Sequence, residues 1–328
     1  MARAVLLNDT STRFHHGCAR VVRLLVEGLA REGVEVAARS PARADWARDR
    51  AFLEALGSAD LVVVNGEGTL HDGAPLGARL LSVLDHPLAA AKPVALVNAL
   101  WERNPPCWDR WLPRLALAAA RDEGSAEALR RGGALEARAL PDLSLSAPWE
   151  GAAGSRRGLV VGDSVRAAPR RALARAAQRL GAAYLPTKAP PGRLWRWGPA
   201  RAALWRAYTG AWSGPLPPLE LAPDEGAYLA RLARAEGHAT GRFHGVCLSL
   251  LAGTPVWAVA SATSKVERLL AEAGLPSRLL SAEALERLSP EEARRPLADS
   301  EARAVAAYLA RARGEARRLF ADLRALCP

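Results

Sequence analysis

Strand-length apolar runs alternate with helical patterns along almost all of this chain of 328 residues. In the first half, strands are predicted at 3–9, 34–39, 61–68, 93–100 and 115–122, with helices near 17–32, 47–57 and 75–86. Strands of a parallel sheet that is covered on both faces form near-continuous apolar runs, and the helices between them supply the cover. The alternation therefore predicts an α/β fold with a mostly parallel sheet.

The composition changes at 146–158, where SAPWEGAAGSRRG predicts a linker between two domains. A second series follows it, with strands expected at 158–164 and 182–186 and helices at 167–180, 224–236, 245–253 and 264–273. A chain of this length is expected to form about two domains. We predict an N-terminal domain over 1–150, a C-terminal domain over 151–298 and an amphipathic helix within 299–328 that packs back on the first domain.

The formal net charge of +11 is typical of proteins that bind nucleic acids, but the distribution of the charge argues against a nucleic-acid partner. Only three of the 45 basic residues are lysines, and the arginines lie along predicted helix faces beside Asp and Glu. An anionic ligand or an anionic membrane surface fits the same charge. We therefore expect no nucleic-acid partner.

The chain starts without a signal-peptide pattern, and no apolar stretch reaches the 18 or so residues that span a bilayer. The four cysteines, Cys18, Cys107, Cys247 and Cys327, lie far apart and show no CxxC spacing. This spacing argues against a zinc site or a disulfide framework. We expect a cytoplasmic protein whose Cys18 and Cys247 are core residues.

The segment Gly241-Arg242-Phe243-His244-Gly245 predicts an anion site with a proton-transfer group inside it. It forms a turn before an apolar helix, and helix N-termini after strands attract anions. Arg242 and, after the next strand, Lys265 add cations, and Glu267 follows on the same turn. His244 is the side chain among them that titrates near neutral pH.

A glycine-rich turn, Gly66-Glu67-Gly68-Thr69, follows the predicted strand at 61–68 and is followed by His71. Glycine permits tight turns and close backbone approach. Glu67 is a candidate base toward a hydroxyl group. An ordinary turn between a strand and a helix is the alternative.

Other polar residues follow the first and fifth predicted strands. Asn8, Asp9 and His16 could form a polar wall for a ligand, and Arg121 either faces that ligand or belongs to a helix start with Asp122 and Ser125. His15 and His16 are adjacent, but no third ligand stands at a metal-binding spacing. We therefore predict no metal site.

The segment 193–212 interleaves Trp195, Trp197, Trp205, Tyr208 and Trp212 with Arg193, Arg196, Arg201 and Arg206. Tryptophan faces stack on sugar rings, and Trp with Arg also marks contact with a membrane interface. A packed insertion is the third alternative. These alternatives remain open at the level of the sequence.

Several motifs together resemble the polysaccharide pyruvyl transferase family. They occur in the family's order and cover most of the chain outside 189–218: NDTS…HHGC (8–18), NGEGTLH (65–71), ARDEGSAEALRRGG (120–133), LPDLSL (140–145), GRFHGVCLSLLAGTPV (241–256) and SKVERLL (264–270).

The resemblance implies two Rossmann-like domains facing a cleft, as in the B-type glycosyltransferase fold. It also implies a bacterial enzyme of cell-surface polysaccharide biosynthesis, which moves a pyruvyl group from phosphoenolpyruvate to two hydroxyls of a free or lipid-linked saccharide, forming a ketal. Phosphoenolpyruvate is then a co-substrate, and no cofactor is expected.

On this reading His244 is the acid/base, and Gly241, Arg242, Lys265 and Glu267 bind the donor. The acceptor side comprises Asn8, Asp9, His16, Gly66, Gly68, His71 and Arg121. A nucleotide-sugar glycosyltransferase and a non-catalytic saccharide-binding protein on the same fold are the rival functions.

Overall fold

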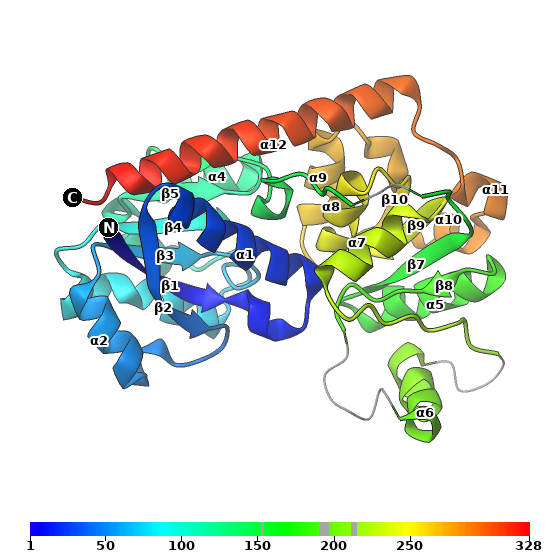
Figure 1. Ribbon diagram of the computed structural model, residues 1–328, viewed down its shortest axis with the longest axis horizontal. Helices are drawn as coiled ribbons and strands as arrows, with labels where there is room; N and C mark the ends of the chain where they lie inside the picture. Colours follow the sequence, from blue (N-terminus) through cyan, green and yellow to red (C-terminus); the bar gives the residue numbers. More distant parts are fainter. Residues whose placement is uncertain (152–153, 190–196, 211–214) are drawn as a thin grey trace. The chain divides into compact units, whose positions relative to one another are not determined.

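The computed structural model describes residues 1–151, 154–189, 197–210 and 215–328 (Figure 1). Its contacts divide the chain into two compact units. The first unit comprises Met1–Arg13, Cys18–Ala147 and Ala310–Pro328, and the second comprises Phe14–Gly17 and Pro148–Leu309. The long C-terminal helix thus contributes residues to both units.

The first unit contains a six-stranded sheet in which every described strand pair is parallel. The spatial order is β2-β1-β3-β4-β5-β6. The chain starts next to one edge of the sheet, forms that edge with β2, and then adds β3 to β6 in sequence order toward the other edge. The strands are β1 (Ala2–Asp9), β2 (Val34–Pro41), β3 (Leu61–Asn65), β4 (Val94–Ala99), β5 (Leu117–Ala120) and β6 (Arg138–Ala139).

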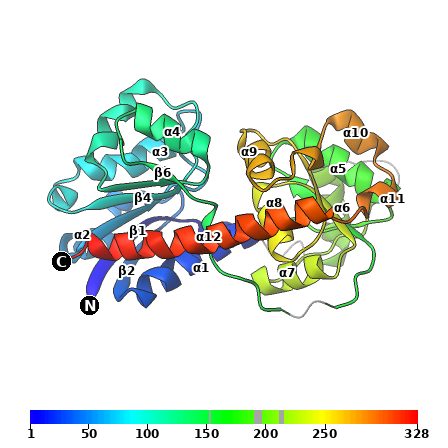
Figure 2. The same ribbon diagram turned by 90° about the horizontal axis from the view of Figure 1, so that it is seen from above.

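Helices cover both faces of this sheet (Figures 1 and 2). Side chains of α1 (His16–Arg31) and of the C-terminal part of α12 (Asp299–Ala325) pack on one face. The other face is covered by α2 (Arg50–Ser58), α3 (Pro75–Leu81), the 3₁₀ helix η5 (Pro106–Arg114) and α4 (Glu123–Arg131). Because both faces are covered, the central strands β3 and β4 are buried throughout.

The second unit contains a five-stranded sheet, again with parallel pairs, in the order β11-β10-β9-β7-β8. The strand order and the parallel direction of the strands match a Rossmann-like arrangement, in which ligands bind at the carboxyl ends of the strands. The strands are β7 (Leu159–Ser164), β8 (Ala183–Tyr184), β9 (Gly237–Gly241), β10 (Val256–Val259) and β11 (Leu279–Leu280).

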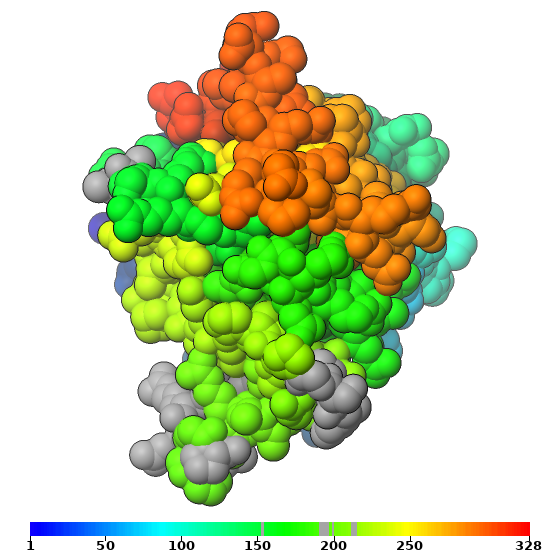
Figure 3. Space-filling view, turned by 90° about the vertical axis from the view of Figure 1, so that its right-hand side faces the viewer, coloured from blue at the N-terminus to red at the C-terminus, as the bar shows by residue number. Residues whose placement is uncertain are grey.

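The helices of the second unit also form two layers. One face of the sheet packs against α5 (Ala167–Arg179), α6 (Gly198–Thr209) and α10 (Ala282–Arg287), and the other against α7 (Glu225–Ala233) and α8 (Phe243–Leu251). Figure 3 shows the outer surface of the green α5 segment beside the orange α10 segment. The remaining helices of this unit are α9 (Lys265–Glu272) and α11 (Pro290–Ala293).

The α/β fold class and the five predicted strands of the first half are confirmed. The predicted helix at 75–86 is shorter, because α3 ends at Leu81 and a 3₁₀ helix, Ser82–Asp85, follows. The sequence reading missed the two-residue strand β6 and the helix α6 inside 189–218. It also treated 1–150 as one body, whereas Phe14–Gly17 belongs to the second unit.

Two helical glycines give a matched test of the core of the first unit. A Cβ added at Gly28 of α1 would lie 2.2 Å from Cζ of Phe320, whereas one at Gly314 of α12 would meet nothing within 4 Å. We expect Gly28→Ala to lower the free energy of unfolding by about 1–3 kcal/mol through overpacking. Gly314→Ala should raise it by about 0.5–1 kcal/mol. Chemical denaturation measures both, and equal effects of the two substitutions would contradict this packing.

Candidate active site

The carboxyl ends of β1 and β3 are locked together by two asparagines. The side-chain amide of Asn8 donates to the carbonyls of Asn65 (2.7 Å) and Glu67 (3.1 Å), and that of Asn65 donates back to the Asn8 carbonyl (3.2 Å). Asn8 has a φ of 64°, a left-handed conformation that Asn tolerates better than most residues. The strained turn holds the loop after β1 against the loop after β3.

Glu67 lies inside this arrangement with 2% of its surface exposed. Its two carboxylate oxygens accept hydrogen bonds from the Thr10 hydroxyl (2.5 Å) and from the Cys18 thiol (2.9 Å). Burial and the neighbouring carboxylate raise the pKa of the Cys18 thiol well above its ordinary value. The thiol therefore remains a proton donor to Glu67, and this arrangement favours a structural role for the carboxylate.

Steric fit and backbone conformation explain why Gly66 and Gly68 of the turn are glycines. A Cβ at Gly66 would lie 2.6 Å from the Cβ of Ala99, so glycine lets the loop pass close to the end of β4. Gly68 has a φ of 72°, where any side chain would be strained. The turn therefore needs glycine at one position for close approach to β4 and at the other for a left-handed backbone conformation.

Asp9 and Arg121 each lie beside a charged partner within the first unit. Asp9 accepts hydrogen bonds from the Ser11 backbone and hydroxyl and lies 3.5 Å from Arg39. Arg121 is buried after β5, with its Nη1 3.8 Å from Asp142. The predicted helix cap beside it is confirmed, because Asp122 accepts a hydrogen bond from the Ser125 backbone.

His71 extends from the loop after β3, with about a quarter of its side chain exposed. Its Nδ1 lies 2.9 Å from a carboxylate oxygen of Asp72, whose other oxygen accepts a hydrogen bond from Nε of Arg103 (2.6 Å). These residues lie in the loops that follow β3 and β4, at the carboxyl edge of the first sheet.

In the second unit, Arg242 forms a buried ion pair with Asp163. Its Nε and Nη2 lie 2.7 and 2.6 Å from one oxygen of Asp163, which is fully buried near the end of β7. Burial opposes the arginine's charge, but the Asp163 carboxylate outweighs it and raises the pKa of Arg242. The pair joins the carboxyl ends of the neighbouring strands β7 and β9.

Asp163 has two further donors. The Thr187 backbone N–H donates to one oxygen (2.9 Å), and the Tyr208 hydroxyl donates to the oxygen that Arg242 binds (3.1 Å). Burial, together with the Asp163 charge, raises the pKa of Tyr208 above its ordinary range. Asp163 therefore organises the loop after β8 and helix α6 as well as Arg242.

His244 lies in the first turn of α8 and is 5% exposed. Its ring lies edge-on to that of His15, with centroids 5.2 Å apart. A Cβ at Gly17 would lie 2.2 Å from Cγ of His244, so only glycine allows this close packing. The HHGC and RFHG motifs thus meet within the second unit.

His16 lies in the same region but packs differently. Its ring stacks on Tyr228 at 4.9 Å, and its backbone N–H donates to the Thr187 carbonyl (3.2 Å). Burial lowers the pKa of His16, which keeps the ring neutral at neutral pH. The structure thus places His16 with the second unit, not with Asn8 and Asp9.

Lys265 begins α9, half-buried, and Glu267 follows in its first turn. Within the part of the chain that the structure describes, several buried hydroxyls near the carboxyl ends of β7 and β10 have no hydrogen-bond partner: those of Ser164, Ser261 and Thr263. Buried polar atoms are normally paired, so this capacity indicates room for a polar ligand's contacts. Gly241 packs against Ser164, where a Cβ would lie 2.7 Å from the serine's Cβ.

The sequence reading missed Asp163, Thr187, Tyr208 and Tyr228. Of these four residues, only Asp163 could have been identified as a site residue from the sequence, because it lies near the carboxyl end of the predicted strand at 158–164. The other three come from segments whose contact with β7 and β9 depends on tertiary packing.

Only part of the Trp/Arg segment can be described. Trp205 is buried and packs on Tyr184 and Tyr208, which supports the packed alternative for this residue. Trp197 is 60% exposed. Arg193, Trp195, Arg196 and Trp212 lie outside the described residues.

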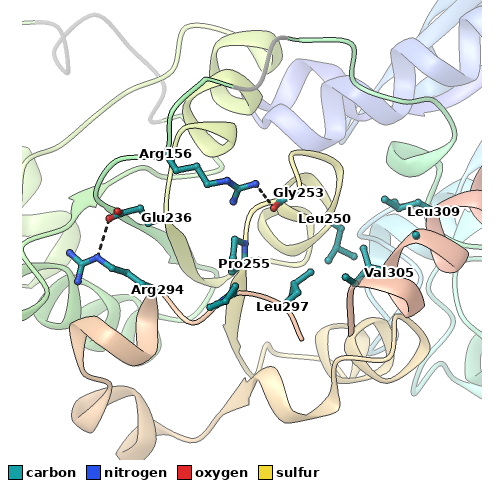
Figure 4. A pocket seen from close by; sticks show the side chains of 12 residues that line it. Arg156, Glu236, Leu250, Gly253, Pro255, Arg294, Leu297, Val305 and Leu309 are labelled. Carbon is teal, nitrogen blue, oxygen red and sulfur yellow. Dashed lines mark hydrogen bonds and ion pairs between the residues drawn. The ribbon is translucent and has the colours of Figure 1, made fainter. Parts of the chain in front are cut away.

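A cavity of about 680 Å³ lies elsewhere in the second unit (Figure 4). Its lining includes Pro255 just before β10 and Glu236 just before β9, so it adjoins the amino ends of these strands. Arg156 and Arg294 lie at one end of it and mainly aliphatic side chains at the other. Because the polar residues above gather at the carboxyl ends, this cavity is separate from the candidate active site.

Comparison with known proteins adds the family. The profile of the family described as polysaccharide pyruvyl transferase matches residues 9–263. The chain belongs to this family. It is accordingly a transferase, and the matched range includes both the loop after β1 and the RFHG motif. No curated protein sequence matches the chain.

Solved structures show the same fold at low identity. A putative UDP-N-acetylglucosamine 2-epimerase from Listeria monocytogenes aligns with a TM-score of 0.59 at 13% identity, covering 96% of this chain and 94% of that one. MnaA from S. aureus, solved with UDP, gives 0.55 at 13% identity and covers 93% and 94%. An alpha-glucosyltransferase, solved with UDP and DNA, gives 0.52 at 9% identity and covers 98% and 99%. The predicted resemblance to the B-type glycosyltransferase fold is confirmed.

Among the described residues, no helix is both long enough and apolar enough to cross a membrane.

The Asp163–Arg242 pair should show strong energetic coupling. We expect Asp163→Asn or Arg242→Gln to lower the free energy of unfolding by about 3–5 kcal/mol, because each leaves a buried charge without its partner. The double variant should cost less than the sum, with a coupling above about 1 kcal/mol. The exposed pair Arg175–Glu286, at 3.1 Å in the same unit, is the control and should couple by less than about 1 kcal/mol. Additive effects at Asp163 and Arg242 would contradict the pair's role.

The four cysteines should differ sharply in reactivity. Cys107 is exposed and the other three are buried, with the pKa of Cys18 raised. We expect a thiol reagent at pH 8 to modify Cys107 rapidly in the folded protein and all four only after unfolding, because the thiolate is the nucleophile. Peptide mass spectrometry assigns the sites. Rapid labelling of Cys18 in folded Cys107→Ser protein would contradict its hydrogen bond to Glu67.

Proposed function

We propose that this enzyme transfers a pyruvyl group from phosphoenolpyruvate to two hydroxyls of a saccharide and forms a cyclic ketal. The donor carries a phosphate and a carboxylate, so its site needs hydrogen-bond donors and positive charge. The observation that carries the proposal is the set of buried hydroxyls of Ser164, Ser261 and Thr263 at the carboxyl ends of β7 and β10, within a chain of this family.

The donor side of the proposal lies at the carboxyl ends of β7, β9 and β10. Lys265 supplies a compact cation at the start of α9, and the Arg242 side chain at the N-cap of α8 makes no capping hydrogen bond to that helix. Arg242 contributes through its ion pair, because Asp163 fixes its guanidinium beside that helix start. Gly241 brings β9 close to Ser164, and Glu267 lies in the first turn of α9.

His244 is the proposed acid in the first step. Protonation of the donor's methylene carbon makes it a methyl group and leaves positive charge on the carbon that bears the phosphate oxygen. An acceptor hydroxyl oxygen bonds to that carbon and gives up its proton. The bond from carbon to the phosphate oxygen then breaks with its electron pair, and phosphate leaves. The second hydroxyl closes the ketal, and its proton leaves on the phosphate.

The acceptor side of the proposal lies at the carboxyl edge of the first sheet. Asn8 and Asp9 end β1, and the segments that follow β3 and β5 supply Gly66, Gly68, His71 and Arg121. In the described part of the chain, buried polar atoms without a hydrogen-bond partner also occur here, at Thr69 and Asn98. Such atoms are available to the hydroxyls of a sugar.

A free or lipid-linked saccharide satisfies this acceptor side. The exposed Trp197 supports contact with a sugar or with an anionic membrane surface at the cytoplasmic face, as an extension of the proposal.

Thermal stability with added phosphoenolpyruvate tests the donor. A ligand that binds only the folded state raises the melting temperature, by an amount equivalent to about 2.7 kcal/mol at 100 times its Kd. We expect this rise in wild type and in Lys92→Ala, the matched lysine control, and its loss in Lys265→Ala. His244→Asn should keep the rise but lose about 10²–10⁴-fold in turnover, because it retains size and polarity without the acid.

Two outcomes would contradict the proposed reaction, and a third would contradict the role of His244. A rise with nucleotide sugars but not with phosphoenolpyruvate would indicate the glycosyltransferase function. Binding of saccharides without consumption of any donor would indicate a non-catalytic protein. Near-normal turnover in His244→Asn would remove His244 from the reaction.

A further inference from the structure

The loops after β3 and β4 form a second, short pairing beyond the ends of the strands. His71 and Glu102 form an isolated parallel bridge. The backbone N–H of Asp72 donates to the Glu102 carbonyl (3.0 Å), and that of Glu102 donates to the Leu70 carbonyl (3.4 Å). His71 is therefore held by backbone hydrogen bonds at the carboxyl edge of the sheet, where parallel sheets bind ligands.

The side chain of His71 is oriented by a charged partner. Nδ1 of His71 lies 2.9 Å from Asp72, and the hydrogen bond from Arg103, followed by that from His71, lowers the pKa of Asp72 to about 2. Asp72 is thus a carboxylate at any working pH. An acceptor-only partner fixes the proton on Nδ1 and leaves the lone pair of the imidazole on Nε2.

This arrangement is held at a conformational cost. Asp72 and Arg103 have φ values of 55° and 52°, in the left-handed region that residues other than glycine seldom adopt. Residues other than glycine in this region carry backbone strain and cluster at functional sites. Arg103 also contacts Glu102, so ion pairs connect His71 to Asp72, Asp72 to Arg103 and Arg103 to Glu102.

We propose that His71 is the base that removes the proton from the attacking acceptor hydroxyl, an assignment that rests on the proposed pyruvyl transfer. As the hydroxyl oxygen bonds to the donor's central carbon, its O–H bond breaks and the proton passes to Nε2 of His71. The imidazolium is stabilised by Asp72 and gives the proton to solvent after the step. Asp72 is the positioning residue, itself held by Arg103.

Glu67 is the alternative base in the same loop, and its contacts favour His71. The carboxylate of Glu67 is 2% exposed and accepts hydrogen bonds from Thr10 and Cys18 on its two oxygens. His71 has about a quarter of its side chain exposed and one nitrogen directed to Asp72. A base must reach the proton that it abstracts within hydrogen-bond distance, directly or through one water molecule.

The test compares histidine variants in an enzyme shown to consume phosphoenolpyruvate. His71→Gln keeps polarity but cannot act as the base, so kcat should fall by about 10²–10⁴-fold with the phosphoenolpyruvate-dependent rise in melting temperature retained. His86→Gln, at another histidine of the first unit, is the matched control and should leave kcat unchanged. Asp72→Asn should lower kcat and leave the KM for phosphoenolpyruvate unchanged, because the carboxylate that fixes the tautomer and orientation of His71 is gone.

Each outcome decides one proposal. If wild type consumes no phosphoenolpyruvate with any saccharide, the pyruvyl transfer itself fails. If wild type is active and His71→Gln keeps its kcat, or if Asp72→Asn raises the KM for phosphoenolpyruvate and leaves kcat unchanged, the assignment of His71 is overturned. Loss of activity in Glu67→Gln with His71→Gln unaffected would transfer the role of base to Glu67.

Discussion

The buried ion pair between Asp163 and Arg242 is the interaction on which the second unit's site depends. Asp163 has no exposed surface, and its carboxylate is satisfied by Arg242, the Thr187 backbone and the Tyr208 hydroxyl. A buried charge is stable only when its partners are in place, so the loop after β8, helix α6 and the start of α8 are fixed together. His244 lies two residues after Arg242, so its backbone belongs to the start of α8 that the ion pair fixes.

The first unit uses hydrogen bonds from uncharged donors for the same purpose. Asn8 and Asn65 tie the ends of β1 and β3, and Glu67 is enclosed by Thr10 and Cys18. His71, in the loop after β3, remains partly exposed and has a carboxylate partner in Asp72. The account thus assigns the acid to His244 and the base to His71, each oriented by packing within its own unit.

The sequence could predict what depends on periodicity and on local chemistry. Apolar runs alternating with helices determine a parallel sheet, and the RFHG segment, an Arg and a His before an apolar helix, marks the end of β9. The glycine-rich turn after β3 could also be predicted from the sequence. Glycines are needed where a loop passes a neighbouring strand closely, as Gly66 passes Ala99.

The partners of these residues could not be predicted, since they depend on which strands are neighbours. β7 and β9 pair although 72 residues separate Ser164 from Gly237, so nothing local joins Asp163 to Arg242. The same is true of His16, which sequence order places beside Asp9 but which stacks on Tyr228. The role of Glu67 depends on a thiol 49 residues away.

The most direct test of pyruvyl transfer is the isotopic composition of the product formed in deuterium oxide. Wild-type enzyme, phosphoenolpyruvate and a panel of saccharides would be incubated, and the product examined by NMR and mass spectrometry with phosphate measured in parallel. The account predicts a ketal whose methyl group carries one deuterium, formed with one phosphate released for each ketal. A product that retains the phosphate, or a saccharide extended only when a nucleotide sugar is supplied, would contradict it.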